Sequence, residues 1–113
     1  MNDCLFCRII AGEIPADIVT STADAVVIRD VNPQAPTHVL VLPRRHVAHL
    51  SEFVAAANDG EAARLFALAS QAGAAADPDG YRVVINEGKH GGQTVYHLHL
   101  HVLAGRQMHW PPG

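Results

Sequence analysis

Within residues 96–103, apolar side chains and histidine alternate strictly from Tyr96 to Val102, and no other feature constrains the fold as much. Successive side chains of a β-strand point to opposite faces of a sheet, so the pattern predicts a strand with three histidines on one face. Three imidazoles in a row cannot all face a dry core without polar partners. We therefore expect one face to line a functional site. The other face carries Tyr96, Leu98, Leu100 and Val102.

The remaining chain contains further strand and helix signals. Four short segments, rich in β-branched residues and bounded by turn residues, predict strands at residues 18–20, 25–29, 39–42 and 82–86. The alanine-rich stretch 55–76 has helical spacing, and Asn58 with Glu61 has the form of a capping box. A shorter helix is expected over residues 5–11. Strands on both sides of a central helix indicate an α+β fold, an antiparallel sheet with helices packed on one face.

Length and composition bound the class of protein. The chain has 113 residues, about half of them apolar, and a net charge of −3. These values predict one folded domain over residues 1–113 and argue against a disordered chain. No basic stretch could follow a nucleic-acid backbone, and no apolar run reaches the roughly 18 residues of a membrane span. The start of the sequence lacks the pattern of a secretory signal, so we expect a cytoplasmic protein without nucleic-acid or membrane partners.

A glycine-rich loop, residues 86–94, directly precedes the histidine segment. Glycines allow backbone amides to approach an anion, and Asn86, Gln93 and Thr94 add neutral hydrogen-bond donors. Two functions fit: a zinc site that uses two or three histidines, or an imidazole that attacks an electrophile. The alternative without function is a solvent-exposed strand rich in histidine. The adjacent loop favours an electrophilic phosphoryl group.

The run His97-Leu98-His99-Leu100-His101-Val102-Leu103 resembles the signature of the histidine triad (HIT) superfamily. Residues 4–15, 30–46, 81–92 and 105–113 are similar to its histidine triad nucleotide-binding (HINT) branch, so the resemblance covers nearly the whole chain. It implies a HIT-like fold and a homodimer with one continuous sheet. In that dimer the C-terminal segment, which contains Trp110, would reach towards the partner's active site.

The resemblance also implies an activity. Members of this branch hydrolyse purine nucleoside phosphoramidates and related adenylates to nucleoside monophosphates such as AMP, through a covalent nucleotidyl-histidine intermediate. Two other functions stay open from the sequence: hydrolysis of dinucleoside polyphosphates, as in a sister branch, and a purine-nucleotide-binding module that docks a partner protein. A structural zinc domain is a further alternative.

The family's functional residues map onto matching positions of this chain. His99 corresponds to the nucleophile, His38 to the supporting fourth histidine, and His101 to the contact with the phosphate or leaving group; His97 is the first triad histidine. The residues implied to hold the substrate are Asn86, Gly92 and Thr94 at the phosphate, Asp30 at the ribose, and Leu5, Phe6, Ile9, Ile28 and Val31 at the base. Without the resemblance, Asp30 would be read as a turn residue and the apolar residues as core. Thr94 stands where the family commonly has serine.

Cys4 and Cys7 form a C-x-x-C pair without the strand and long helix of a redox motif. Two cysteines supply half of a tetrahedral zinc site. The resemblance implies that His46 and His97 complete it, and His49 is a competitor for His46. Four protein ligands leave no open position, so this zinc would be structural. The alternative is a pair of reduced cysteines without metal.

Overall fold

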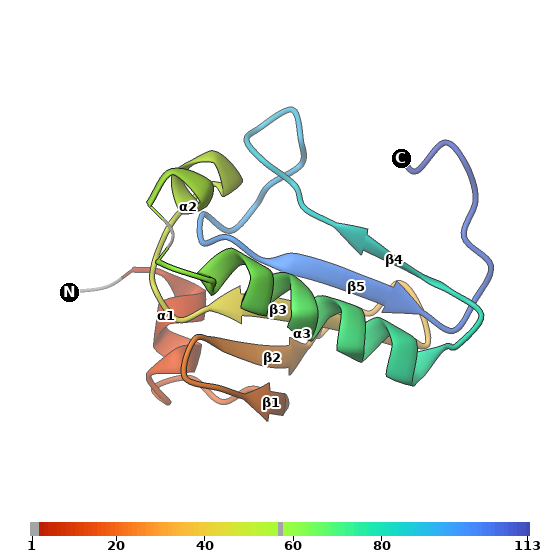
Figure 1. Cartoon of the computed structure of the whole chain (residues 1–113), viewed down its shortest axis with the longest axis horizontal. Helices are drawn as coiled ribbons and strands as arrows, with labels where there is room; N and C mark the ends of the chain where they lie inside the picture. The colour runs from red at the N-terminus through yellow and green to blue at the C-terminus, as the bar shows by residue number, and fades with distance from the viewer. Residues whose placement is uncertain (1–2, 57) are drawn as a thin grey trace.

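The computed structural model describes residues 3–56 and 58–113. Its centre is a five-stranded antiparallel sheet with strand order β1-β2-β3-β5-β4 (Figure 1). The strands are β1 (Ile18–Ser21), β2 (Ala25–Arg29), β3 (Thr37–Pro43), β4 (Tyr81–Val84) and β5 (Leu100–Ala104). Each of the four pairings is antiparallel, which confirms the α+β fold.

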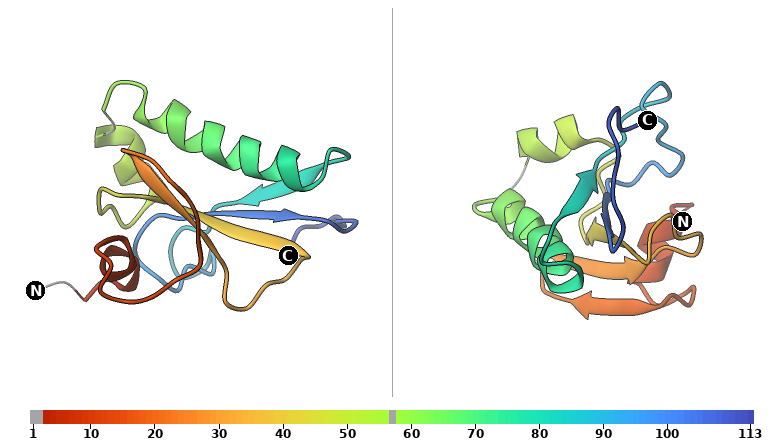
Figure 2. Two further views of the ribbon diagram at one scale, coloured as in Figure 1. Left: turned by 90° about the horizontal axis from the view of Figure 1, so that it is seen from below. Right: turned by 90° about the vertical axis from the view of Figure 1, so that its right-hand side faces the viewer.

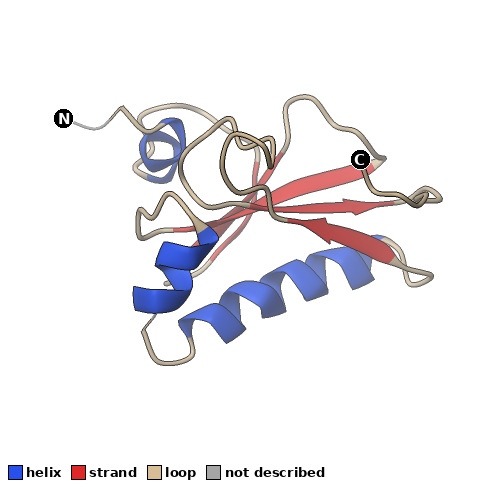
Figure 3. Ribbon diagram, turned by 90° about the horizontal axis from the view of Figure 1, so that it is seen from above, coloured by secondary structure: helices blue, strands red, loops and turns tan. Residues whose placement is uncertain are grey.

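Helices cover both faces of the sheet (Figures 2 and 3). The expected layer on one face consists of α2 (Leu50–Ala56) and α3 (Glu61–Ala76), and its core includes Phe53 and Leu65 against β2, β3 and β5. The short helix α1 (Leu5–Ile10) packs on the opposite face, where Phe6 and Ile9 meet the other side of β2 and β3. Alternate residues of these two strands therefore belong to two separate cores, one on each face of the sheet. In the described part of the chain, no helix is long and apolar enough to cross a bilayer.

The helix predicted over residues 55–76 is divided into α2 and α3, and position 57 lies outside the described residues. The cap of α3 is Gly60, whose φ of 74° is a left-handed conformation that glycine adopts without strain. Asn58 is thus not the cap, but half of the predicted capping box is present. The Asn58 backbone N–H donates to the Glu61 carboxylate at 3.0 Å. Glu61 also pairs with Arg45, so a tertiary contact fixes the start of α3.

The last strand begins later than predicted, at Leu100 instead of residue 96. The β3–β5 register pairs Val41 with Leu100, and its continuation would set Pro43 opposite Leu98. Proline has no N–H for the ladder, and the Pro43 carbonyl is bonded to the His97 ring at 2.8 Å. The segment before β5 therefore leaves the ladder.

The alternation of side chains persists in part through that irregular segment. Leu98, Leu100 and Val102 are buried in the core beneath α3, as predicted. The prediction for Tyr96 was wrong, because its side chain is 47% exposed and its ring meets His49 edge-on. Residue 96 lies outside the β5 ladder, so the period of two does not govern its direction.

Candidate functional site

A cavity of about 620 Å³ opens on the sheet face that carries α1. It lies between α1, the end of β2 and the loop that precedes β5, so three segments distant in sequence form its walls. It brings together all nine residues expected to hold the substrate and two of the four histidines expected to be catalytic: Leu5, Phe6, Ile9, Ile28, Asp30, Val31, Asn86, Gly92, Thr94, His99 and His101. The other two, His38 and His97, lie behind its wall, each bonded to neighbouring groups.

The cavity has an apolar end and a polar end. Phe6, Ile9 and Ile28 are buried in the core between α1 and the sheet and present apolar surface to the cavity. Phe6 and Ile9 are three residues apart on α1, a spacing that sets both side chains on one helix face. Val31 is fully exposed at the rim. This shape suits a flat apolar ring at one end and a polar or charged group at the other.

His99 is held in one tautomer by the backbone. Its Nδ1 donates to the His97 carbonyl at 2.7 Å, because a carbonyl oxygen can only accept. The other nitrogen, Nε2, therefore keeps its lone pair in the neutral ring. The imidazole is only 7% exposed and contacts the Phe6 ring edge-on at 5.0 Å between centroids. The site thus holds a nearly buried imidazole with one oriented, unprotonated nitrogen.

A hydrogen-bond chain runs from the backbone to His101. The Gln34 N–H donates to His38 Nδ1 at 3.0 Å, so neutral His38 carries its proton on Nε2. That atom lies 2.9 Å from His101 Nδ1 and 3.4 Å from the Asp30 carboxylate. His101 accepts at Nδ1 and therefore has its own N–H at Nε2. Burial, together with the neighbouring His99 and His38, lowers the pKa of His101 to about 4, so the ring is neutral near pH 7.

Asp30, His38 and His101 lie close enough together to hold a cation. The Gln34 N–H argues against this, because a cation would need the lone pair at His38 Nε2. The Nδ1 of His38 would then carry a proton facing another N–H. The geometry fits a hydrogen-bond chain better. Asp30 also accepts from the Asn32 N–H at 2.8 Å, so this residue stabilises a turn and lines the cavity at once.

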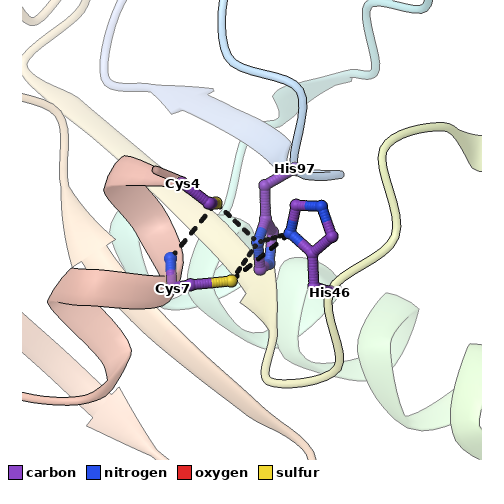
Figure 4. Close-up of side chains that lie close together, drawn as sticks. All are labelled: Cys4, Cys7, His46 and His97. Atoms are coloured by element: carbon purple, nitrogen blue, oxygen red, sulfur yellow. Dashed lines mark hydrogen bonds between the residues drawn. The ribbon is translucent and has the colours of Figure 1, made fainter. Parts of the chain in front are cut away.

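A second cluster lies beside the cavity and consists of Cys4, Cys7, His46 and His97 (Figure 4). Cys4 Sγ lies 3.3 Å and Cys7 Sγ 3.4 Å from His97 Nδ1. His46 Nδ1 is 3.3 Å from Cys7 Sγ and 3.2 Å from His97 Nδ1. The His97 ring donates from Nε2 to the Pro43 carbonyl, which leaves the Nδ1 lone pair facing the sulfurs. Two thiols and two correctly oriented imidazoles form a donor set that suits tetrahedral zinc.

His49, the competitor for His46, lies outside this cluster. Its Nδ1 is 3.1 Å from the Oε1 of Gln93, whose side chain is buried beneath the glycine-rich loop. His46 follows the end of β3 closely enough to reach the two cysteines, whereas His49 comes just before α2. The structure therefore assembles the Cys4, Cys7, His46 and His97 set.

The sequence predicted that the Gln93 side chain donates to a bound anion, and the structure places it elsewhere. Its side chain points into the protein, while Gly92 and Thr94 line the cavity on either side of it. Three loop amides are also used internally: the Gly88 N–H donates to the Gln93 side chain, the Gly92 N–H to the Lys89 carbonyl, and the Gln93 N–H to the Gly88 carbonyl. A polar residue between two cavity-lining neighbours is the sequence signal that could have indicated this inward position.

The fold and the site define an α+β protein with a histidine-lined cavity on one sheet face and an adjacent Cys2His2 cluster. The family model described as HIT domain matches residues 11–108. This chain belongs to the HIT domain family. The result confirms the resemblance at the level of the superfamily.

Similar proteins agree with this assignment. A 14 kDa zinc-binding protein of Zea mays is 41% identical over 122 residues, which cover 96% of this chain and 87% of that protein. A HIT family hydrolase from Legionella pneumophila superposes with a TM-score of 0.88 at 44% identity, covering 98% of this chain and all of that one. A histidine triad nucleotide-binding protein from Candida albicans gives a TM-score of 0.78 at 30% identity, covering 88% and 73%. The chain thus has the fold of a HIT family hydrolase.

Proposed function

We propose that this protein hydrolyses purine nucleoside phosphoramidates and related adenylates to nucleoside monophosphates through a covalent intermediate on His99. The observation that carries the proposal is the oriented tautomer of His99. Its Nδ1–H is bonded to the His97 carbonyl, and its Nε2 lone pair is available in a ring that lines the cavity. A neutral imidazole is a competent nucleophile near pH 7.

The reaction proceeds in two displacements. In the first, His99 Nε2 bonds to phosphorus, the phosphorus–nitrogen bond of the substrate breaks, and the amine leaves with a proton from solvent. The positive charge that develops on His99 is stabilised because Nδ1–H already faces the His97 carbonyl. In the second, water attacks phosphorus and gives up a proton to solvent as the bond to Nε2 breaks, which releases the nucleotide and neutral His99. The His101 Nε2–H donates to a phosphoryl oxygen or to the leaving group, and His38 fixes the orientation of that ring.

The two ends of the cavity divide the substrate between them. The apolar end, with Phe6, Ile9 and Ile28, would hold the purine, and Leu5 and Val31 would border it at the rim. The Asp30 carboxylate would accept hydrogen bonds from the ribose hydroxyls. Asn86, Gly92 and Thr94 would contact the phosphate beside His99. The likeness to a histidine triad nucleotide-binding protein supports this assignment.

The second cluster would hold a structural zinc ion. Cys4, Cys7, His46 and His97 would be its ligands, and four protein ligands leave no position for a reacting water molecule. The ion would connect α1 to the residue whose carbonyl orients His99. The zinc-binding relative from Zea mays supports this proposal. Reduced cysteines of this kind fit a cytoplasmic protein, the location we propose.

A homodimer would complete the assembly. β4 is the last strand of the sheet order, and Tyr81 and Val83 on it are each 37% exposed. Pairing of two such edges would join two sheets into one and cover these side chains. Trp110, which is 83% exposed, lies in a C-terminal segment anchored by the bond from Arg82 to the His109 carbonyl. In the dimer this segment would extend towards the partner's cavity.

Rapid-quench mass spectrometry of the intact protein with an adenosine phosphoramidate tests the mechanism. We expect a transient mass increase of one adenylate in wild type and in His101→Ala, but no increase in His99→Ala. Equal slow turnover in wild type and His99→Ala without an adduct would contradict the proposal. AMP binding that survives such a result would favour a nucleotide-binding module.

A further inference from the structure

We propose that Gln93 is a positioning residue for the phosphate end of the cavity. Its buried side-chain amide fastens the loop of residues 86–94 to Ala48 and His49, so that Gly92 and Thr94 face the substrate. This inference rests on the proposed function, because it assigns a role in holding the phosphate group of a nucleotide.

The Gln93 side chain uses its full hydrogen-bonding capacity. Its Nε2 donates to the carbonyls of Ala48 at 2.7 Å and of Val95 at 3.1 Å. Its Oε1 accepts from the Gly88 N–H at 2.9 Å and lies 3.1 Å from His49 Nδ1, which donates to it. A primary amide offers two donors and an acceptor oxygen with two lone pairs, and each is used. The residue is only 6% exposed, so these bonds are shielded from water.

Other side chains of similar size do not fulfil this role. Glutamate has the same shape but no donors, and it would set a buried negative charge against the carbonyls of Ala48 and Val95. Methionine fills a similar volume but leaves these two carbonyls and the Gly88 N–H without their partner. The pattern of two carbonyls, one N–H and one imidazole therefore selects glutamine in this position.

The contacts of Gln93 set the loop relative to the nucleophile. They connect both ends of the tight turn, through Gly88 and Val95, to the segment that leads into α2. Glu87 adds an outer contact by accepting from the Ser51 N–H at 3.2 Å and from its hydroxyl at 3.3 Å. The turn itself is closed within the loop, where the Gln93 N–H donates to the Gly88 carbonyl. The loop is thus a preformed unit, and Gln93 determines where that unit lies.

The base end of the cavity meets these contacts only at the backbone carbonyl of Val95, whose side chain packs against the core beneath α1. Ile9 and Ile28 belong to the core between α1 and the sheet, and Asp30 is held by Asn32 and His38. Loss of the Gln93 contacts should therefore displace Gly92 and Thr94 and leave the base and ribose walls unchanged. Binding of the phosphate should weaken selectively, whereas a loss of general stability would affect both ends of the cavity.

Isothermal titration calorimetry with AMP and with adenosine separates these two effects. For Gln93→Met we expect the AMP dissociation constant to rise about tenfold or more, as when hydrogen bonds to a charged group are lost, and adenosine binding to stay within about twofold. Gln71→Met, at an exposed position of α3, is the matched control and should bind both ligands as wild type does. Gln93→Asn keeps the amide on a shorter side chain and should give an intermediate AMP value.

Other results of this titration would contradict or decide the positioning role of Gln93. Unchanged AMP affinity in Gln93→Met, or a parallel loss for both ligands, would overturn the positioning role. If Gln93→Met does not fold, the Gln93→Asn variant decides by the same ratio of AMP to adenosine affinity. Wild-type protein that binds neither ligand would overturn the proposed function and this inference with it. Wild type that binds AMP and forms the His99 adduct, with both Gln93 variants unaffected, would overturn this inference alone.

Discussion

At the scale of single residues, backbone carbonyls and amides decide what each histidine can do. His97 and His99 each donate to a carbonyl oxygen, from opposite nitrogens of the ring. His97 is left with Nδ1 facing two thiols, and His99 with Nε2 in the cavity wall. His38 instead accepts a hydrogen bond from the Gln34 N–H at Nδ1, and its own Nε2–H donates to His101 Nδ1. Four identical side chains thus obtain different chemical properties from their hydrogen-bond partners.

The pKa of His101, lowered to about 4 mainly by burial, predicts a pH dependence of stability. The groups that face this ring are His38, His99 and Asp30. His101 has an ordinary pKa of 6.5 in the unfolded chain, so its contribution is complete above pH 6.5. It is lost as the pH falls towards 4, because only the unfolded state takes up the proton.

Urea unfolding at pH 7 and pH 5 measures this effect. Between these two pH values we expect the free energy of unfolding to fall more for wild type than for His101→Asn. The difference should correspond to the uptake of about one additional proton by the unfolded state of wild type. His90→Asn, which removes an exposed histidine of the loop, is the control. Equal losses in wild type and His101→Asn would contradict the prediction.

At the scale of elements, α1 joins two sites because its two sides differ. Cys4 and Cys7 lie towards His46 and His97, while Phe6 and Ile9 pack into the core and line the cavity. Phe6 also contacts the rings of both His97 and His99. A helix of six residues is too short to be stable alone, so its position depends on these contacts.

Removal of zinc should therefore weaken α1 and the base end of the cavity together. We expect about one zinc per chain by elemental analysis of wild type and almost none in Cys7→Ala. A free zinc concentration one hundred times the dissociation constant stabilises a folded protein by about 2.7 kcal/mol, so chelation should lower the midpoint of thermal unfolding measurably. Adenosine binding should weaken in parallel. Chelated wild type whose unfolding midpoint equals that of the zinc-loaded protein would contradict the structural role.

The start of α3 provides a second prediction at this scale. The Glu61 carboxylate is 6% exposed and accepts from Arg45 Nη2 at 3.0 Å and from the Asn58 N–H. The hydrogen bond from Arg45 lowers the pKa of Glu61, so the carboxylate is charged at pH 7. We expect Glu61→Ala to reduce the free energy of unfolding by about 2–3 kcal/mol, because Arg45 and the amide lose a partly buried acceptor.

Glu13→Ala serves as the control in the same denaturant experiment. Glu13 pairs with Arg8 on the surface, where its side chain is 60% exposed. Exposed ion pairs contribute little, so a change below about 1 kcal/mol is expected. Equal effects of Glu61→Ala and Glu13→Ala would show that the capping contact does not stabilise α3.

At the scale of the whole molecule, the sheet has an unpaired edge at β4, and this edge is where we expect a second copy of the chain to bind. Val83 lies on the edge strand β4 and is 37% exposed. We expect wild type to have about twice the 12.1 kDa mass of one chain by light scattering, and Val83→Lys to have the mass of one chain. A charge at a paired edge prevents association. Val54→Lys, at an exposed site on α2, should remain dimeric. Wild type with the mass of one chain would contradict the dimer.

Much of this protein follows from local sequence. The period of two before and within β5, the β-branched runs of β2 and β3 and the helical spacing of α3 identify most of the elements, because these signals are local in the sequence. The histidine pattern and its family resemblance also indicated the residues that line the cavity, from Leu5 to His101. That resemblance also implied which histidine is a zinc ligand, which is the nucleophile and which supports it. The periodicity by itself offered no basis for these assignments.

The tertiary structure decided what depends on distant partners. It divided the alanine-rich stretch, because Glu61 meets Arg45 and Gly60 permits the left-handed turn. It prevented the β5 ladder from extending to Pro43 of β3. It also turned the Gln93 side chain inward, where it bonds to two carbonyls and an imidazole. Hydrogen-bond partners far apart in sequence meet only after folding. The sequence by itself therefore determined the histidine segment and the apolar side chains that alternate with it. The tertiary structure determined that His101 lies in β5 while His97 and His99 precede it, and which nitrogen of each ring is held by a backbone carbonyl.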